Sequence, residues 1–215
     1  MSTTTTRWRR GSVLAAVAAV LAAGMVTVAA IMLTVPGAQQ RGGSGGVDLA
    51  GNTVQLDGPP PAPAASAAPS GHGRFAAPSV GLDVPLGALD VVDGVIEPPG
   101  FTSAYWVRNL GVDPTAPASG TVFVAMHSLR AGGLGPGNAL IDVAHARARI
   151  AVGAPITVDG TTYRVTRTET VTKQDIRSDA GVWADVPGRL VVVTCLQRPD
   201  GRRSVDNVVI EATRG

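Results

Sequence analysis

The stretch LVVVTC, residues 190–195, is the clearest strand signal in this chain. Leucine and valines form a short apolar run, and β-branched residues of this kind favour strands. The run ends on a threonine and a cysteine and is followed by a polar loop. A second stretch of the same design, GTVFVAMH at residues 120–127, ends on a histidine. The sequence therefore predicts two buried strands, each with a chemically reactive side chain at its end.

The rest of the C-terminal part alternates between short β-rich runs and turn residues. Asp-Gly pairs between such runs favour the turn that joins paired strands, and they predict two hairpins. Short helical segments are expected at 138–148 and within 99–107. Several short strands with little helix predict one all-β domain, a β-barrel or a sandwich, over residues 74–215. The hairpins fall at 91–96 and 156–165, and strands at 80–84, 120–126, 163–171, 190–195 and 205–212.

The N-terminal part contains an uncharged apolar run at residues 12–35. About 20 apolar residues cross a bilayer as a helix, so this run predicts a transmembrane anchor. Three arginines lie within residues 1–11, and no basic residue follows the run until Arg41. The positive-inside rule then predicts a cytoplasmic N-terminus, a single membrane span and an extracellular remainder. The alternative is a cleaved signal peptide, whose apolar region usually has about 7–15 residues.

Residues 36–73 have the composition of a linker. They contain GGSGG at 42–46, PPPAP at 59–63 and a stretch rich in Ala, Ser and Pro at 64–71. Such a segment buries too little apolar surface to fold alone, so a disordered tether is expected between anchor and domain. The formal charge of the chain is only +2, so the sequence lacks the large excess of basic residues that is typical of nucleic-acid binding.

Cys195 is the only cysteine of the chain and cannot form an internal disulfide. Its use is therefore packing or reactivity. A free cysteine is often a small buried hydrophobic residue. Against that reading, Cys195 stands at the end of its strand, precedes a polar loop and is the sole thiol of a domain expected outside the cell. A reactive nucleophile is the alternative that these features favour.

His127 and the arginines that follow Cys195 could complete such a site. A histidine at a strand end, before a glycine-rich loop, is suited to proton transfer near neutral pH. An arginine could stabilise the oxyanion of a tetrahedral intermediate, and Arg198, Arg202 and Arg203 are the candidates. A zinc site needs more ligands than one cysteine and the histidines His127 and His145 supply, so no metal and no cofactor is expected.

At these residues the chain resembles the sortases, the cysteine transpeptidases of Gram-positive cell surfaces, and it looks most like the class E/F enzymes of actinobacterial type. The resemblance lies in residues 120–127, in 190–195 and in DNVVI at 206–210, in the order anchor, linker, histidine, Thr-Cys and terminal strand. It implies an eight-stranded β-barrel. It also implies that His127 is the acid/base, Cys195 the nucleophile and an arginine near the last strand the oxyanion partner.

The sequence departs from the family pattern at the arginine. Relatives often carry it directly before the Asp-Asn pair, where this chain has Val205. Side chains alternate along a strand, so Arg203 would share a face with Val205 and Asn207 if the strand began early enough. Arg203 is therefore the predicted oxyanion residue, with Arg198 as the second choice.

The resemblance implies cleavage of an LPxTG-like motif in secreted proteins through an acyl-thioester. Transfer to an amine of the cell wall would follow. The partners would be proteins with a C-terminal sorting motif, a cell-wall amine acceptor and the membrane. The alternatives are a tethered β-barrel that binds peptides without turnover, or another cell-wall cysteine peptidase. A papain-like enzyme would place the cysteine before the histidine, which is the opposite order.

Overall fold

The computed structural model describes residues 45–55 and 68–215. The described residues all belong to one compact unit, residues 43–215. Among them no helix is both long enough and apolar enough to cross a membrane. The predicted anchor at 12–35 and the predicted cytoplasmic segment at 1–11 lie outside the described residues.

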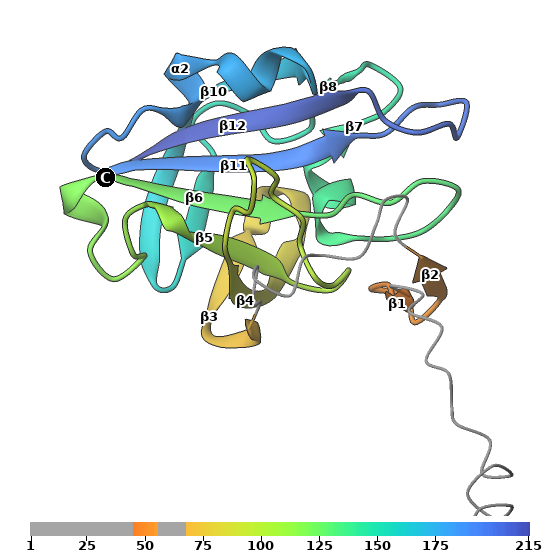
Figure 1. Ribbon diagram of the computed structural model, residues 1–215, viewed down its shortest axis with the longest axis horizontal. Coiled ribbons are helices and arrows are strands. Elements are labelled where there is room, and N and C mark those ends of the chain that lie inside the picture. Colours follow the sequence, from red (N-terminus) through yellow and green to blue (C-terminus); the bar gives the residue numbers. More distant parts are fainter. Residues whose placement is uncertain (1–44, 56–67) are drawn as a thin grey trace, which may run out of the picture. The chain divides into compact units, whose positions relative to one another are not determined.

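Eight strands close into a barrel in the order β10-β12-β11-β6-β5-β4-β3-β9. This confirms the predicted all-β eight-stranded barrel, and Figure 1 shows β12, β11, β6 and β5 side by side. The β4–β5 and β6–β11 pairs are parallel and the other pairs of the barrel are antiparallel. The strands are β3 (Ala68–Ala77), β4 (Leu82–Leu89), β5 (Ala104–Gly111), β6 (Thr121–Met126), β9 (Pro155–Val158), β10 (Thr161–Thr172), β11 (Arg189–Leu196) and β12 (Asp206–Arg214).

Both predicted Asp-Gly turns form. Asp159 and Gly160 have φ of 47° and 80°, the left-handed pair that a two-residue hairpin loop needs, and they join β9 to β10. Asp93 and Gly94 adopt the same conformation. The hairpin at 91–96, however, shrinks to one isolated bridge between Val92 and Val95.

Two predicted helical segments are wrong. Residues 138–148 form the end of a 3-10 helix, η4 (Pro136–Leu140), and a small hairpin of β7 (Ile141–Asp142) and β8 (Arg147–Ala148). Residues 104–107, expected in a helical turn, belong to β5. The other helical elements are short: η2 (Pro78–Val80), η3 (Pro117–Ser119), η5 (Asp175–Ser178) and α2 (Ala180–Trp183).

Parts of the predicted disordered linker have regular structure. A hairpin of β1 (Gly45–Val47) and β2 (Thr53–Gln55) lies within it, and β3 already begins at Ala68. The buried carboxylate of Asp48 accepts hydrogen bonds from the backbone N–H groups of Ala50 and Asn52 inside the hairpin turn. It also accepts one at 2.9 Å from the N–H of Leu134. The composition of residues 36–73 did not reveal this hairpin, because a buried carboxylate, rather than buried apolar surface, holds it.

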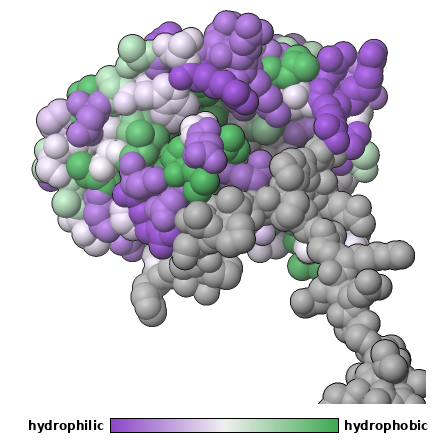
Figure 2. All heavy atoms as spheres, viewed as in Figure 1, coloured by the Kyte–Doolittle hydropathy of each residue, from purple (hydrophilic) through white to green (hydrophobic). Residues whose placement is uncertain are grey.

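The barrel wall separates two apolar clusters. Alternate side chains along β11 and β12, such as Val192 and Ile210, fill the interior. The intervening ones, such as Val191 and Val209, point outward and pack under Ile176 of the segment 172–188. In the view of Figure 2, apolar side chains appear as separate patches among hydrophilic ones. The segment 172–188 therefore covers the outer apolar cluster next to β11.

Candidate functional site

Cys195 and His127 lie near the ends of two neighbouring parallel strands. β11 pairs with β6 so that Thr194 lies opposite Met126, the last residue of β6; Cys195 follows Thr194 in β11, and His127 follows Met126. Thr194 and Met126 are buried, and the Thr194 hydroxyl donates to the Met126 carbonyl at 2.9 Å. Because side chains alternate, Cys195 and His127 lie on the outer face. The predicted nucleophile and the predicted acid/base thus come from one edge of the barrel wall.

The imidazole of His127 is held by the loop before β5. Its Nε2 lies 2.8 Å from the carbonyl oxygen of Pro98, and its ring centroid lies 5.1 Å from that of Phe101. A carbonyl can only accept, so Nε2 carries a proton and donates it. Nδ1 is then the nitrogen that can take or give a proton in a reaction. Glu97 also lies near, with Oε1 3.6 Å from Nε2.

Burial lowers the pKa of His127 below its ordinary value of 6.5, because the charged ring loses its water. The Pro98 carbonyl acts in the opposite direction and raises it, and the positive charge of Lys173 lowers it further. At neutral pH the ring is therefore mostly neutral. A neutral imidazole can accept the proton of a thiol, which is the first requirement for a cysteine nucleophile.

The loop 128–137 is fastened to both strand ends. The N–H of Gly137 donates to the carbonyl of His127 at 2.8 Å. The hydroxyl of Ser128 donates to the carbonyl of Cys195, and the amide Nε2 of Gln197 donates to the Ser128 carbonyl at 2.8 Å. A Cβ at Gly137 would lie 2.0 Å from Thr194 Oγ1, so only glycine permits this approach. The glycine-rich loop is thus joined by hydrogen bonds to both strand ends that carry the site.

Two of the three candidate arginines are engaged elsewhere. Arg198 and Arg202 each bind the carboxylate of Asp200, at 2.7 Å and 2.9 Å. These contacts hold the pKa of Asp200 well below its usual range. Arg203 is exposed and lies three residues before the start of β12. The strand does not begin early enough to align Arg203 with Cys195, so its oxyanion role stays a prediction.

Sequence reasoning passed over Asn207. On β12 this residue lies directly opposite Cys195 in the antiparallel pair with β11, and it is only 8% exposed. The signal in the sequence was a single amide at the head of the apolar run 207–210. Without the register, nothing connected that amide to the cysteine.

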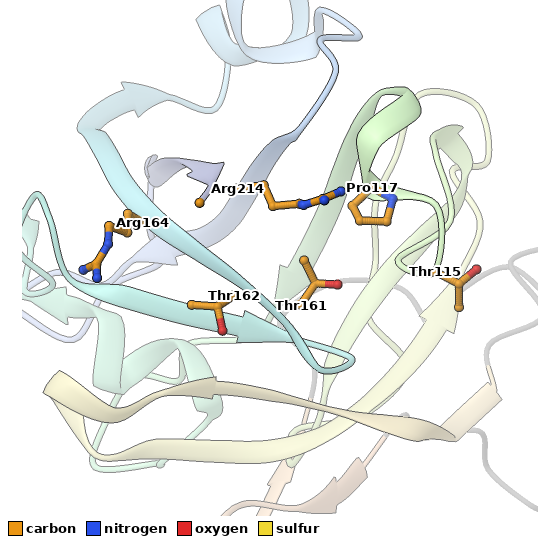
Figure 3. A pocket seen from close by; sticks show the side chains of 7 residues that line it. Thr115, Pro117, Thr161, Thr162, Arg164 and Arg214 are labelled. Carbon is orange, nitrogen blue, oxygen red and sulfur yellow. The ribbon is translucent and has the colours of Figure 1, made fainter.

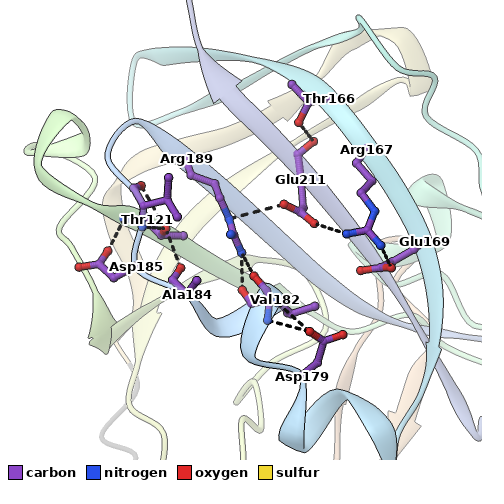
Figure 4. A network of polar contacts seen from close by, with 12 residues as sticks. Thr121, Thr166, Arg167, Glu169, Asp179, Val182, Ala184, Asp185, Arg189 and Glu211 are labelled. Carbon is purple, nitrogen blue, oxygen red and sulfur yellow. Dashed lines mark hydrogen bonds and ion pairs between the residues drawn. The ribbon is translucent and has the colours of Figure 1, made fainter.

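The segment 172–188 lies over the outer face of the barrel and is held there by polar contacts. Arg189 donates to the carbonyls of Gly181 and Val182, and its Nε lies 3.7 Å from a carboxylate oxygen of Glu211 (Figure 4). Asp185 accepts from the N–H of Thr121 at 2.6 Å. These contacts explain how the segment keeps its place beside the strand that carries Cys195.

A pocket of about 600 Å³ lies away from Cys195. It lies beside the Arg189 end of β11, because Gly188 donates to Pro117 and accepts from Arg214. Six residues separate Arg189 from Cys195, or about 20 Å along a strand. In Figure 3 the side chain of Arg214 extends toward Pro117, whereas Arg164 lies farther along β10. The residues that line the pocket are Thr115, Pro117, Thr161, Thr162, Arg164, Arg214 and Gly215.

Comparison with known proteins gives solved sortases as structures similar to this barrel. Sortase A from Corynebacterium diphtheriae, a lid mutant, aligns with a TM-score of 0.48 and 14% identity, over 66% of this chain and 69% of that chain. The pilus-related sortase C of Group B Streptococcus gives 0.49 and 15%, over 66% of each chain. Listeria monocytogenes sortase A gives 0.45 and 20%, over 66% of this chain and 86% of that chain.

No protein-family model and no curated protein matches the sequence. The similarity to these solved structures concerns the fold of the barrel. Within the described ranges, no group of three His, Cys, Asp or Glu side chains is placed to hold a metal ion. The function is therefore inferred from the side chains around Cys195.

Proposed function

We propose that this chain is a sortase-type cysteine transpeptidase. The observation that carries the proposal is the placement of Cys195 and His127 at adjacent strand ends on the same outer face. The fixed Nε2–H of His127, which leaves Nδ1 for proton transfer, supports it. The sequence resemblance to the class E/F enzymes of actinobacterial type points the same way.

In the proposed reaction, Nδ1 of His127 accepts the proton of the Cys195 thiol. The sulfur attacks the carbonyl carbon of the threonine in an LPxTG-like motif, and the carbonyl π pair moves onto oxygen. When that pair returns, the C–N bond to glycine breaks and the imidazolium protonates the leaving amine. An amine acceptor then attacks the acyl-thioester and releases Cys195. Arg203 is the predicted charged partner of the oxyanion.

The proposed setting is the outer face of the cell membrane. Residues 12–35 would anchor the chain with residues 1–11 in the cytoplasm. Substrates would be secreted proteins with a C-terminal sorting motif, and the acceptor an amine of the cell wall. A membrane tether would keep the site where secreted substrates and lipid-linked acceptors meet.

The test is the intact mass of the full chain in detergent after incubation with a panel of LPxTG peptides. We expect a covalent adduct on Cys195 that is absent in Cys195→Ala. We expect its rate to fall about 10²–10⁴-fold in His127→Ala, the usual range for loss of a general acid/base. His145→Ala is the matched control, because His145 is an exposed histidine that pairs with Asp142.

Two results would contradict the proposal in different ways. A folded chain with an unreactive thiol and no adduct, but with retained peptide binding, would favour the peptide-binding barrel without turnover. A reactive thiol without any peptide adduct would refute the substrate class and keep the cysteine chemistry.

A further inference from the structure

Asn207 is placed opposite Cys195 by the register of two antiparallel strands. Cys195 pairs with Asn207, and the neighbouring pair on the same face joins Val193 to Val209. Residues directly opposite in such a pair point to the same face, with Cβ atoms about 4.5–5.5 Å apart. Val209 belongs to the outer cluster, so Cys195 and Asn207 both point outward. The amide of Asn207 is therefore within side-chain reach of the sulfur.

The amide of Asn207 differs from the other asparagine amides in the described part of the chain. Those of Asn52, Asn109 and Asn138 each donate a hydrogen bond to a carboxylate or a backbone carbonyl. Asn207 is only 8% exposed, yet its side chain makes no hydrogen bond to another described residue. Buried amides are normally paired. Val209, two residues further along β12, lies in the outer cluster, so the amide of Asn207 lies on the outer face of the barrel.

We propose that the side-chain amide of Asn207 donates a hydrogen bond to the oxyanion formed when Cys195 attacks a carbonyl. The inference rests on the proposed function only in requiring that Cys195 attack a carbonyl carbon. In that step the S–C bond forms, the π pair moves onto oxygen and the thiol proton goes to His127. The Asn207 N–H stabilises the negative oxygen until the pair returns and expels the leaving group. Asn207 is then a catalytic residue for this face of the barrel.

Strand register favours Asn207 over the arginines at this position. Arg198 and Arg202 are bound to Asp200, and Arg203 precedes β12, so no strand register places it beside the sulfur. The strand fixes the backbone of Asn207 opposite Cys195, so its amide loses less freedom on binding the oxyanion than a side chain from a loop does, and preorganised donors are favoured. A charged side chain arriving from the loop could add to this effect without replacing the amide.

The experiment compares two reactions of Cys195 in the full chain in detergent. Acylation by p-nitrophenyl acetate passes through an oxyanion, whereas alkylation by iodoacetamide does not. We expect Asn207→Ala to slow acylation about 10²-fold, the usual loss for one oxyanion donor, and to leave alkylation unchanged. Asn207→Asp, which keeps the shape but replaces the donor by a negative charge, should slow acylation at least as much.

Asn109→Ala is the matched control and Arg203→Ala the competing variant. Asn109 is exposed and bonds to the backbone of Val91 on another part of the barrel, so neither reaction should change. Equal losses in both reactions for Asn207→Ala would mark a structural role and overturn the inference. Undiminished acylation in Asn207→Ala, with a large loss in Arg203→Ala, would also overturn it. The inference would also be overturned if p-nitrophenyl acetate acylated the wild-type protein no faster than it acylates N-acetylcysteine.

The outcomes separate this inference from the proposed function. A selective acylation defect in Asn207→Ala, in a protein that forms no adduct with any LPxTG peptide, supports the amide and refutes the peptide substrate. Peptide adducts that form equally fast in wild type and Asn207→Ala refute the amide and support the transpeptidase.

Discussion

The two ends of strand β11 carry polar side chains that are used in opposite ways. At the Arg189 end, Arg189, Glu211 and Asp185 are tied into contacts that hold the segment 172–188. At the Cys195 end, the amide of Asn207 has no hydrogen bond to a described residue, and Nδ1 of His127 is left for proton transfer. This difference indicates that a buried polar group whose hydrogen-bond partners are in place has a structural role. A buried polar group without such partners is a candidate for a role in catalysis.

The largest expected effect lies at the Arg189 end. Arg189→Met removes a buried cation, which leaves the carbonyls of Gly181 and Val182 without their donor and removes the ion pair with Glu211. We expect a loss of about 3 kcal/mol in the free energy of unfolding, as when one partner of a buried ion pair is removed. Chemical denaturation measures it. The rate of Cys195 alkylation should not change, and a parallel loss of alkylation would show that the two ends are coupled.

A smaller loss of stability is expected at the other end. Thr194→Val keeps the shape of the side chain and removes the buried hydrogen bond to the Met126 carbonyl. The expected cost is about 1–2 kcal/mol in the free energy of unfolding, because an acceptor is left unpaired inside the barrel. Here the alkylation rate should change too, since this bond joins the strand ends that carry Cys195 and His127. Unchanged thiol reactivity would show that the strand ends are positioned without it.

The pH dependence of stability and of Cys195 acylation gives a further test of the Cys195 end of β11. Burial lowers the pKa of His127 below 6.5, so its protonation opposes folding. The contribution of the neutral ring to stability is complete above pH 6.5 and is lost as pH falls from 6.5 through the lowered pKa. The acid limb of Cys195 acylation should likewise lie below pH 6.5, and NMR titration of the ring checks both.

Lys173→Gln should move the acid limb of Cys195 acylation to higher pH. The positive charge of Lys173 lowers the pKa of His127, so its removal raises the pKa toward 6.5. The shift should be small and should shrink with added salt, since Lys173 is exposed. Arg177→Gln is the control, an exposed cation of the same segment. A limb that does not move would show that burial alone sets the pKa of His127.

The smallest effect concerns the hairpin β1–β2. Asp48→Asn weakens its contacts to Leu134 and to the hairpin turn, while the barrel strands are untouched. We expect faster hydrogen exchange at residues 45–55 with an unchanged melting temperature. Hydrogen bonds from Leu134 lower the pKa of Asp48, so acid should loosen the same contact as pH falls below about 3.8. Loss of barrel stability would contradict this separation.

The strands and turns could be predicted because their signals are local. The β-branched run at 190–195 predicted strand β11, and both predicted Asp-Gly turns form, although only the one at 159–160 joins two full strands. The helix at 138–148 was wrong because tertiary pairing of β7 with β8 overrode weak local preference, with Ala146 in the left-handed region. The hairpin in the linker was missed because its anchor, Leu134, is 86 residues away from Asp48.

The sequence by itself determined an all-β domain and two strand ends that carry a thiol and an imidazole. Strand propensity, turn geometry and the scarcity of cysteine are properties of neighbouring residues. The tertiary structure decided which side chains meet there. The register of β12 against β11 places Asn207, not an arginine, opposite Cys195. Register depends on barrel closure and on the course of the loop before β12, and no local signal encodes either one.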